Sequence, residues 1–470
     1  MFFRIFLVLF VLNSSTGFSQ DQPWTLKRCI EYAVENNIQI KQGNLSVQMA
    51  EKVLLESKAK ALPRVNANMY HGYNFGRTVD PFTNNFVLDK IRSNSFSING
   101  SVVLFSGLQT LNKIKQSKND LAASKWDSKI NVYDINLAIA SNYLQILFND
   151  EMVLVANNQV ELSKMQFSQT NKLVKAGTLA RGSLLDIQAQ LSSDELQLIE
   201  AQNRLQLSYL SLMQLMDIPY ESSFRVFIPE INLDTYTDII GTAESIYVIA
   251  LEKLPQIKSS NEKQKSAEKG VSIAKGGLLP TLTLGGSYGS GYSDARKSIV
   301  GAVPIFDTLG FTVSGEDVVF PNYSYSYETT SFNEQFKDNI NQNIGFNLSI
   351  PVFNGLQTKT NIARAEIAFK NAQYNVQLEK QKLKENIQRA YFDAAAALKK
   401  YRSTKNAVVA YKEAFDYMKK KFDVGLVTAL NFTDSKNKLG MSESELLQAK
   451  YDYVYKLKLL DFYQGNPMDL

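Results

Sequence analysis

The chain has 470 residues, 44% of them hydrophobic, and its 51 basic and 46 acidic residues give a formal net charge of +5. A chain of this length and apolar content can bury large cores. The charges are mixed along the sequence without a long basic run, so the composition does not indicate a nucleic-acid partner. A single cysteine, Cys29, excludes an internal disulfide framework.

The first residues predict an exported protein. Arg4 precedes an apolar run at residues 5–12, and the small residues Gly17 and Ser19 stand where a cleavage site requires them. This pattern is typical of a secretory signal peptide, which is too short to span a membrane as a helix. We therefore predict a signal peptide at residues 1–19. No later run approaches about twenty apolar residues, so we predict no transmembrane helix.

The next elements change their period along the chain. Residues 25–61 follow a helical pattern, which Pro63 ends, and alternation at residues 65–69 predicts a strand. A polar and aromatic loop follows at about residues 72–94. Alternation then returns at residues 96–105, which predicts a second strand with one apolar face and one small polar face.

A very long helix is predicted from about residue 108 to residue 175, followed by a turn at 177–183 and a second helix. At 1.5 Å per residue the first of these helices is about 100 Å long. Apolar residues recur every seven positions on both helices, which indicates coiled-coil packing. The two rows are Val132, Ile139, Ile146, Val153, Val160, Phe167 and Val174, and Leu184, Leu191, Leu198, Leu205 and Leu212.

A short stretch of the chain occurs twice. Phe105-Ser106-Gly107-Leu108-Gln109-Thr110 recurs as Phe353-Asn354-Gly355-Leu356-Gln357-Thr358, at an offset of 353 − 105 = 248 residues. In both places an alternating pattern changes to a helical one, so we predict strand-to-helix corners at Phe105 and Gly107 and at Phe353 and Gly355. The same offset pairs Tyr143 with Tyr391, Gly177 with Gly425, and Asp186 with Asp434. The chain is therefore interpreted as an internal duplication.

The opening of the chain is repeated too, at an offset of 280 − 63 = 217 between Pro63 and Pro280. The difference, 248 − 217 = 31, is the number of extra residues between the strands of the second copy. They fall in a segment rich in Gly, Ser, Tyr and Asn at about residues 290–339, for which we predict a long surface loop. The predicted domains are a first repeat at 20–219, a connector at 220–242 and a second repeat at 243–470.

The strands point to an outer membrane. In an exported protein, strands with one apolar and one small polar face are expected in a barrel that has lipid outside and water inside. Four strands cannot close a barrel, and open edges are not tolerated in hydrocarbon, so several protomers must share one barrel. Aromatic residues near the strand ends predict a girdle at the membrane interface: Tyr70, Tyr73, Phe75, Phe82, Tyr288 and Tyr292.

On the duplication and one further motif, the chain resembles the TolC-like outer-membrane efflux proteins over essentially all of its mature length. The family's helix-tip motif is similar to Val424-Gly425-Leu426-Val427-Thr428-Ala429-Leu430-Asn431-Phe432-Thr433-Asp434. The resemblance implies an α+β membrane protein whose long coiled-coil helices form a periplasmic α-barrel. It also implies a homotrimer, in which four transmembrane strands from each protomer complete a twelve-stranded β-barrel.

The resemblance implies a gate at the helix tips. In the family, two acidic positions of the motif face the lumen and form cation-binding rings. Here the first position is Asn431 and the second is Asp434, while Val427 stands where TolC has an arginine that helps to tie the closed tip. A threefold ring of Asp434 would attract cations and repel anions. Its repeat mate Asp186 is a second gate candidate, and the alternative for both is a solvated carboxylate on a helix face.

The resemblance also implies partners. The helix tips at Gly177, Thr178, Gly425, Leu426 and Val427 would dock onto a periplasmic adaptor protein linked to an inner-membrane transporter, and outer-membrane lipid would surround the barrel. The chain would be the exit duct of a tripartite efflux or secretion system. Drugs, metal ions and secreted proteins all remain possible substrates.

Two other classes of protein fit the sequence less well. An exported, elongated coiled-coil protein with a soluble β-domain would share the heptads, but the duplicated strands and the signal peptide favour the duct. An enzyme is disfavoured: His71 is the only histidine, and no nucleophile, base and orienting group can be assembled. Gly285–Gly291 lacks the lysine of a phosphate loop. We predict no catalytic residue, no cofactor and no metal site.

Overall fold

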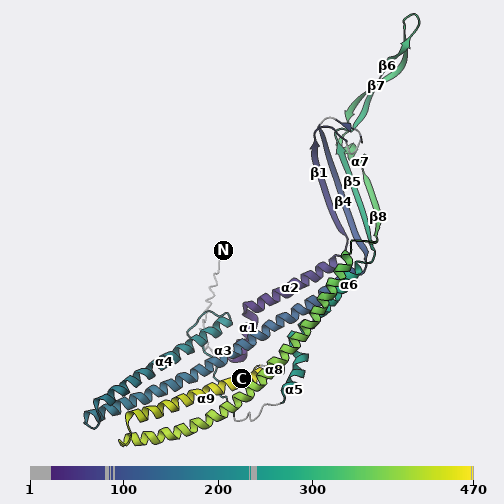
Figure 1. Ribbon diagram of the computed structural model, residues 1–470. Helices are drawn as coiled ribbons and strands as arrows, with labels where there is room; N and C mark the ends of the chain where they lie inside the picture. The colour runs from purple at the N-terminus through teal and green to yellow at the C-terminus, as the bar shows by residue number, and fades with distance from the viewer. Residues whose placement is uncertain are drawn as a thin grey trace, which may run out of the picture. The chain divides into compact units, whose positions relative to one another are not determined.

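The computed structural model describes residues 23–79, 84, 86–87, 90–231, 233, 241–466 and 468, so the predicted signal peptide and Phe82 lie outside the described residues. The chain forms two compact units (Figure 1). The helical unit comprises Met1–Gln48, Ala122–Asn261 and Asn375–Leu470, and the strand unit comprises Met49–Leu121 and Glu262–Tyr374.

The long helices repeat with the same lengths in the two halves of the chain. The first half contains α1 (Leu26–Asn36), α2 (Ile38–Ala59), α3 (Gln109–Lys175) and α4 (Arg181–Leu215), and the second contains α5 (Ala243–Lys253), α6 (Pro255–Gly276), α8 (Gln357–Asp423) and α9 (Ala429–Tyr463). The lengths are 11, 22, 67 and 35 residues in each half. The duplication predicted from the sequence is thus present helix for helix, whereas the residue bounds of the repeats stay a prediction.

The single helix predicted at residues 25–61 is two helices, because Asn37 interrupts it. The Asn37 side-chain oxygen accepts hydrogen bonds from the backbone N–H of Gln39 at 2.8 Å and of Ile40 at 3.2 Å, so it caps the start of α2. Its amide nitrogen donates to the Leu215 carbonyl at 2.9 Å. In the second half, Pro255 begins α6, where its missing N–H would have had no helical partner.

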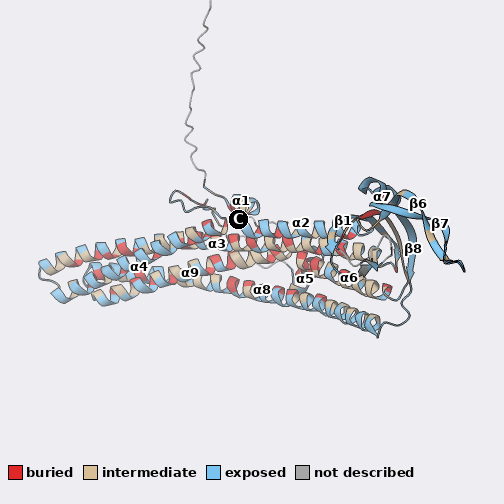
Figure 2. Cartoon of the chain, turned by 90° about the horizontal axis from the view of Figure 1, so that it is seen from above, coloured by how far each residue is buried: buried red, intermediate tan, exposed pale blue. Residues whose placement is uncertain are grey.

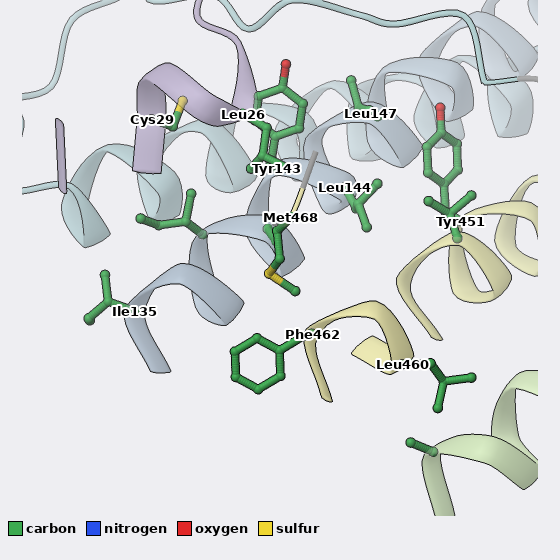
Figure 3. Close-up of a cluster of buried hydrophobic side chains, with 14 of the residues drawn as sticks. Leu26, Cys29, Ile135, Tyr143, Leu144, Leu147, Tyr451, Leu460, Phe462 and Met468 are labelled. Atoms are coloured by element: carbon green, nitrogen blue, oxygen red, sulfur yellow. The ribbon is translucent and has the colours of Figure 1, made fainter. Parts of the chain in front are cut away.

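The predicted seven-residue rows line the interior of the helical unit. Ile139, Ile146 and Leu212 of these rows are buried in one apolar cluster, which also contains Ile387 of α8. Figure 3 shows part of this cluster, where Leu26 and Cys29 from α1 lie near Tyr143 and Leu144 from α3 and Phe462 from α9. The Tyr143 hydroxyl donates to the Trp24 carbonyl at 3.1 Å and to the Phe227 carbonyl. Burial of the heptad rows therefore brings α1, α3, α8 and α9 together.

Four strands of the strand unit form one antiparallel sheet in the order β1-β4-β5-β8. These are β1 (Arg64–Asn74), β4 (Ile91–Ser106), β5 (Thr281–Ser293) and β8 (Asn341–Ser349). The last strand, β8, ends at Ser349, shortly before Pro351, which has no N–H to offer a neighbouring strand. A two-stranded ribbon of β2 (Thr78–Val79) and β3 (Phe86–Val87) lies between β1 and β4 in sequence.

The prediction of a long loop at residues 290–339 is wrong. This segment contains β6 (Lys297–Phe311), β7 (Asp317–Thr329) and α7 (Phe332–Asp338), and β6 pairs with β7 in an antiparallel hairpin. Its Gly and Ser content suggested a loop, but Tyr323, Tyr325 and Tyr327 alternate at the period of a strand. Backbone pairing over this length outweighs the local preference of the small residues for turns.

The register of the sheet separates its two faces. Met69 lies opposite Phe96, Ile98 opposite Tyr288, and Leu284 opposite both Val102 and Phe346. Because side chains alternate along a strand, these apolar residues share one face. The other face carries small polar residues: Asn66, Asn68, Ser97, Asn99, Ser287, Asn343 and Asn347. Most of both faces is exposed in the single chain, as the pale-blue strands of Figure 2 show.

The helices offer no membrane-spanning segment. Among the described residues, no helix is both long enough and apolar enough to cross a lipid bilayer.

Candidate gate at the helix tips and the strand-to-helix corners

The two predicted corners have the same backbone. Gly107 and Leu108 have φ of +59° and +61°, and Gly355 and Leu356 have φ of +60° and +66°. The side chain before each glycine closes the corner: the Ser106 and Thr110 hydroxyls are 2.9 Å apart, and Asn354 donates to the Thr358 hydroxyl. Two successive left-handed residues turn the chain sharply before each long helix. At the first corner α3 begins at Gln109, directly after β4 has ended at Ser106, whereas at the second corner residues 350–356 separate the end of β8 from the start of α8.

Only the first corner is tightly enclosed. A Cβ atom on Gly107 would lie 2.2 Å from the Gly276 carbonyl oxygen, whereas one on Gly355 would meet nothing within 4 Å. The side chains of Phe105 and Phe353 beside these corners are exposed. Gly107 is therefore required both for its φ and for the close approach of the end of α6.

The two helix tips also share one turn. Gly177 and Gly425 both have φ of +77°. The Gly177 N–H donates to the Val174 carbonyl at 3.0 Å and the Thr178 N–H to the Leu173 carbonyl at 3.0 Å. The equivalent bonds from Gly425 to Phe422 and from Leu426 to Lys421 are both 2.9 Å. This pair of bonds is a Schellman motif, which ends a helix on a left-handed glycine.

The second tip is better supported than the first. The Thr428 hydroxyl accepts from the Asn431 N–H at 3.3 Å and caps α9, whereas Ala180 at the start of α4 has no side-chain cap. Phe415, Phe422, Phe432 and Leu439 form a small apolar cluster, against which Val427 packs. Leu426 at the turn itself is 74% exposed. Leu426 is therefore exposed at a turn that the apolar cluster and the Thr428 cap support.

The structure places the acidic gate candidates on exposed helix faces. Asp434, Asn431 and Asp186 are all exposed in the single chain. The Asp434 carboxylate accepts from Lys438 Nζ at 2.7 Å, one turn further along α9. This carboxylate raises the pKa of the Lys438 ammonium, chiefly through the hydrogen bond. Asp434 is therefore neutralised locally by Lys438 rather than joined to Asp186.

A buried polar cluster near the tip was missed by the sequence analysis. Lys436 on α9 is 2% exposed and Asp194 on α4 is 3% exposed, and the two form an ion pair. Lys436 also donates to the Ser163 hydroxyl on α3 at 2.5 Å, and Gln190 donates to Asp194 at 2.8 Å. Burial lowers the pKa of Lys436, and the hydrogen bond that Lys436 donates to the Asp194 carboxylate opposes that shift. The cluster joins helices from the two halves of the chain.

The sequence did hold a signal for this cluster. Asp194 lies three residues after Leu191, and Lys436 lies three residues before Leu439, so each shares a helix face with one of these leucines. We infer that the buried pair of Asp194 and Lys436 favours one pairing and one register of these helices. Among the described residues, no group of acidic, histidine or cysteine side chains could hold a metal ion.

Each half of the chain contains strands with one apolar face and long helices that pack through heptad rows. Together these features are typical of the class of exported ducts. The family model described as "Outer membrane efflux protein" matches residues 29–217 and 246–466, and the chain belongs to this family. Members of the family are outer-membrane transport ducts without enzymatic activity. They form trimers and work in efflux and secretion systems.

Named relatives agree with this assignment. The chain is 23% identical to the outer membrane protein TolC of Vibrio cholerae over 95% of its own length and 92% of that protein. It is 21% identical to the alkaline protease secretion protein AprF of Pseudomonas aeruginosa, over 66% of this chain and 59% of that protein. The CmeC outer membrane channel of Campylobacter jejuni has the same fold, with a TM-score of 0.74 and 17% identity over 94% of this chain and 86% of that chain.

Replacing each corner glycine with alanine should separate the cost of the left-handed backbone from the cost of a steric clash. We expect Gly355→Ala to lower stability by about 1–2 kcal/mol, the cost of a left-handed conformation for a residue with a Cβ atom. Gly107→Ala should have the same strain and in addition a clash with the Gly276 carbonyl, so its loss should be larger by about 1–3 kcal/mol. Thermal unfolding of the detergent-purified proteins measures both, and equal losses would contradict the close approach at Gly107.

Breaking the buried ion pair should be far more harmful than removing both charges. Lys436→Met leaves Asp194 buried without a cation, and we expect a loss of about 3–5 kcal/mol. The double variant Lys436→Met/Asp194→Leu should recover most of it. Lys438→Met, at an exposed lysine on the same helix, is the matched control and should leave stability nearly unchanged, because exposed ion pairs contribute little. Denaturant unfolding measures these differences, and a harmless Lys436→Met would contradict the cluster.

Proposed function

We propose that three copies of this chain form the exit duct of a tripartite efflux or secretion system. The observation that carries the proposal is the register of the four-stranded sheet, which places the apolar side chains on one face and small polar side chains on the other. Its edge strands, β1 and β8, have no further partner in the described chain. Three such sheets joined edge to edge give a closed twelve-stranded barrel with lipid outside and a wet lumen.

The sequence repeats fit a threefold assembly of this kind. Each of the two predicted repeats, at 20–219 and 243–470, supplies two strands of the main sheet and one long helical hairpin. Three chains then contribute six equivalent hairpins to a periplasmic helical tube. A hairpin whose heptad rows are buried on one side can use its remaining surface against the next hairpin, as in other long coiled-coil assemblies.

The helix tips are the proposed docking surface for the adaptor protein. The tip turns at Gly177, Thr178, Gly425 and Leu426 are exposed, and Val427 packs beneath the second turn. An exposed leucine on a rigid turn is a suitable anchor for a helical partner, since apolar anchors at well-defined positions carry most of the energy of such interfaces. Transport energy would come from the inner-membrane transporter to which the adaptor is linked.

The named relatives indicate the kinds of substrate that a duct of this class can pass. Relatives with printed cargo include a toxin and drug export protein and an alkaline protease secretion protein. We propose that selectivity lies mainly with the transporter and the adaptor, and that the duct contributes the charge of its tip. An exported coiled-coil protein with a soluble β-domain is not favoured, because the apolar sheet face would be left in water.

The proposed gate predicts opposite effects for the two members of one ion pair. Asp434→Ala leaves Lys438 unpaired at the tip, so three copies should reduce cation preference in planar bilayers. Lys438→Ala leaves Asp434 unpaired, so cation preference should rise, because a ring of carboxylates attracts cations. Asp186→Ala tests the repeat mate in the same assay. Unaltered selectivity in both Asp434→Ala and Lys438→Ala would remove this pair from the pore.

Charge on the proposed lipid face should impair assembly. Phe346 and Asn347 are adjacent on β8 but lie on opposite faces of the sheet. Phe346→Asp places a carboxylate toward hydrocarbon and should destabilise the barrel by on the order of 2 kcal/mol per chain. Asn347→Asp faces the lumen and should be tolerated. Trimer yield from outer membranes on a native gel measures the difference, and equal yields would mean that the facing is wrong.

A further inference from the structure

The short helix α7 covers one end of the apolar sheet face. The rings of Phe332 and Phe336 lie 6.2 and 5.7 Å from the ring of Phe96 on β4, and the Phe332 ring lies 5.6 Å from that of Tyr292 on β5. Phe96 shares its face with Ile98 and Val102, because they are two and six residues further along the strand. The helix is therefore seated on the face that is proposed to meet lipid.

Specific hydrogen bonds hold α7 in this place. The fully buried Gln335 donates to the Ser293 and Thr330 carbonyls, both at 2.8 Å, and accepts from the Ser293 N–H at 3.0 Å. Ser290, which lies opposite Phe96, donates to the Phe336 carbonyl at 2.6 Å. These hydrogen bonds hold α7 in a defined position against the end of the sheet.

The outward side of α7 is polar. Its inward residues Phe332, Gln335 and Phe336 follow the three- and four-residue spacing of one helix face. Asn333, Glu334 and Lys337 are exposed. The Phe332 and Phe336 rings remain 42% and 36% exposed, so the helix presents apolar rings beside polar side chains at one end of the sheet. Such a mixture suits the level where hydrocarbon gives way to polar headgroups.

The position of α7 along the strand matches one boundary of a bilayer. From Phe96 to the corner at Phe105 there are 105 − 96 = 9 residue steps. At about 3.3 Å per residue these span about 30 Å along the strand. With a tilt of roughly 40° their height is about 23 Å, close to the roughly 25 Å apolar band of outer-membrane barrels. If the corner marks the inner boundary, α7 stands at the outer one.

Aromatic and basic side chains lie at the same level of the sheet. Arg92 lies opposite Tyr73 on the apolar face and donates to the Tyr292 hydroxyl at 2.8 Å. Lys90 Nζ lies 4.3 Å from the centre of the Tyr73 ring. Such rings with a polar tip concentrate where a membrane meets water. Of the predicted girdle, Tyr73 and Tyr292 are on the apolar side, whereas Tyr70 lies opposite Ser95 on the polar face.

We propose that α7 is an interfacial collar: it ends the lipid-facing band of each protomer and contacts the polar headgroups of outer-leaflet lipid through Asn333, Glu334 and Lys337. The inference rests on the proposed function, because it requires the apolar sheet face to be in the membrane. Three copies would place three such helices around the barrel. They would fix the depth of the duct in the membrane, since sinking the collar would bury its polar side in hydrocarbon.

Depth-resolved labelling tests this proposal on the full-length protein. Single cysteines are introduced as Lys337→Cys, Ile344→Cys and Asn343→Cys and are labelled with a fluorescent maleimide. The one native thiol, Cys29, is buried, and burial raises its pKa to about 12, so it stays protonated and unreactive. The proteins are reconstituted in phosphatidylcholine vesicles that carry a nitroxide either on the headgroup or in the middle of the acyl chain, and a water-soluble quencher is used separately.

The three labels should respond to three different quenchers. The Ile344→Cys label should lose fluorescence to the mid-chain nitroxide and the Asn343→Cys label to the soluble quencher, which tests the barrel itself. The Lys337→Cys label should lose most to the headgroup nitroxide, and adding Phe332→Ala/Phe336→Ala should transfer its response to the soluble quencher. If the first two labels behave as expected but Lys337→Cys responds only to the soluble quencher, or to none because a second copy covers it, the collar is overturned.

Discussion

The arrangement of the chain depends on a sharp backbone corner in which two successive residues have positive φ. This corner occurs at Gly107 and Leu108 and again at Gly355 and Leu356. A leucine in the left-handed region is unfavourable by about 1–2 kcal/mol, so the conformation persists only because its surroundings stabilise it. In both halves of the chain the corner directly precedes a 67-residue helix, and it connects that helix to a strand with one apolar face. A lipid-facing element and a water-facing element are thereby covalently continuous.

The strand unit and the helical unit leave different surfaces unsatisfied in a single chain. In the part of the chain that the structure describes, the sheet has two unpaired edges and an exposed apolar face. The apolar face is unfavourable in water, and the open edges are unfavourable in lipid until neighbouring copies pair with them. The helices already bury their heptad rows within the chain. The sheet therefore depends on neighbouring copies more than the helices do. The duct depends on the register that separates the apolar face of the sheet from its polar face.

Near the helix tips, stability and specificity are in tension. An apolar cluster of phenylalanines supports the second tip, and next to it a buried lysine and aspartate join helices from the two halves. Apolar residues of similar size could hold these helices at least as strongly, but they would tolerate sliding and mispairing. The ion pair of Asp434 and Lys438, by contrast, is exposed and lies within one helix, so it joins no two helices.

The sequence by itself determined the duplication, the long helices, the corners and the alternation of the main strands, because each is a local pattern whose period or repeat can be read along the chain. Tertiary structure decided the rest. The pairing of Asp194 with Lys436, 242 residues apart, depends on which helices meet, and no local pattern contains that information. The hairpin β6–β7 and the collar α7 formed where Gly and Ser suggested a loop, because backbone pairing and a buried Gln335 outweigh weak turn preferences.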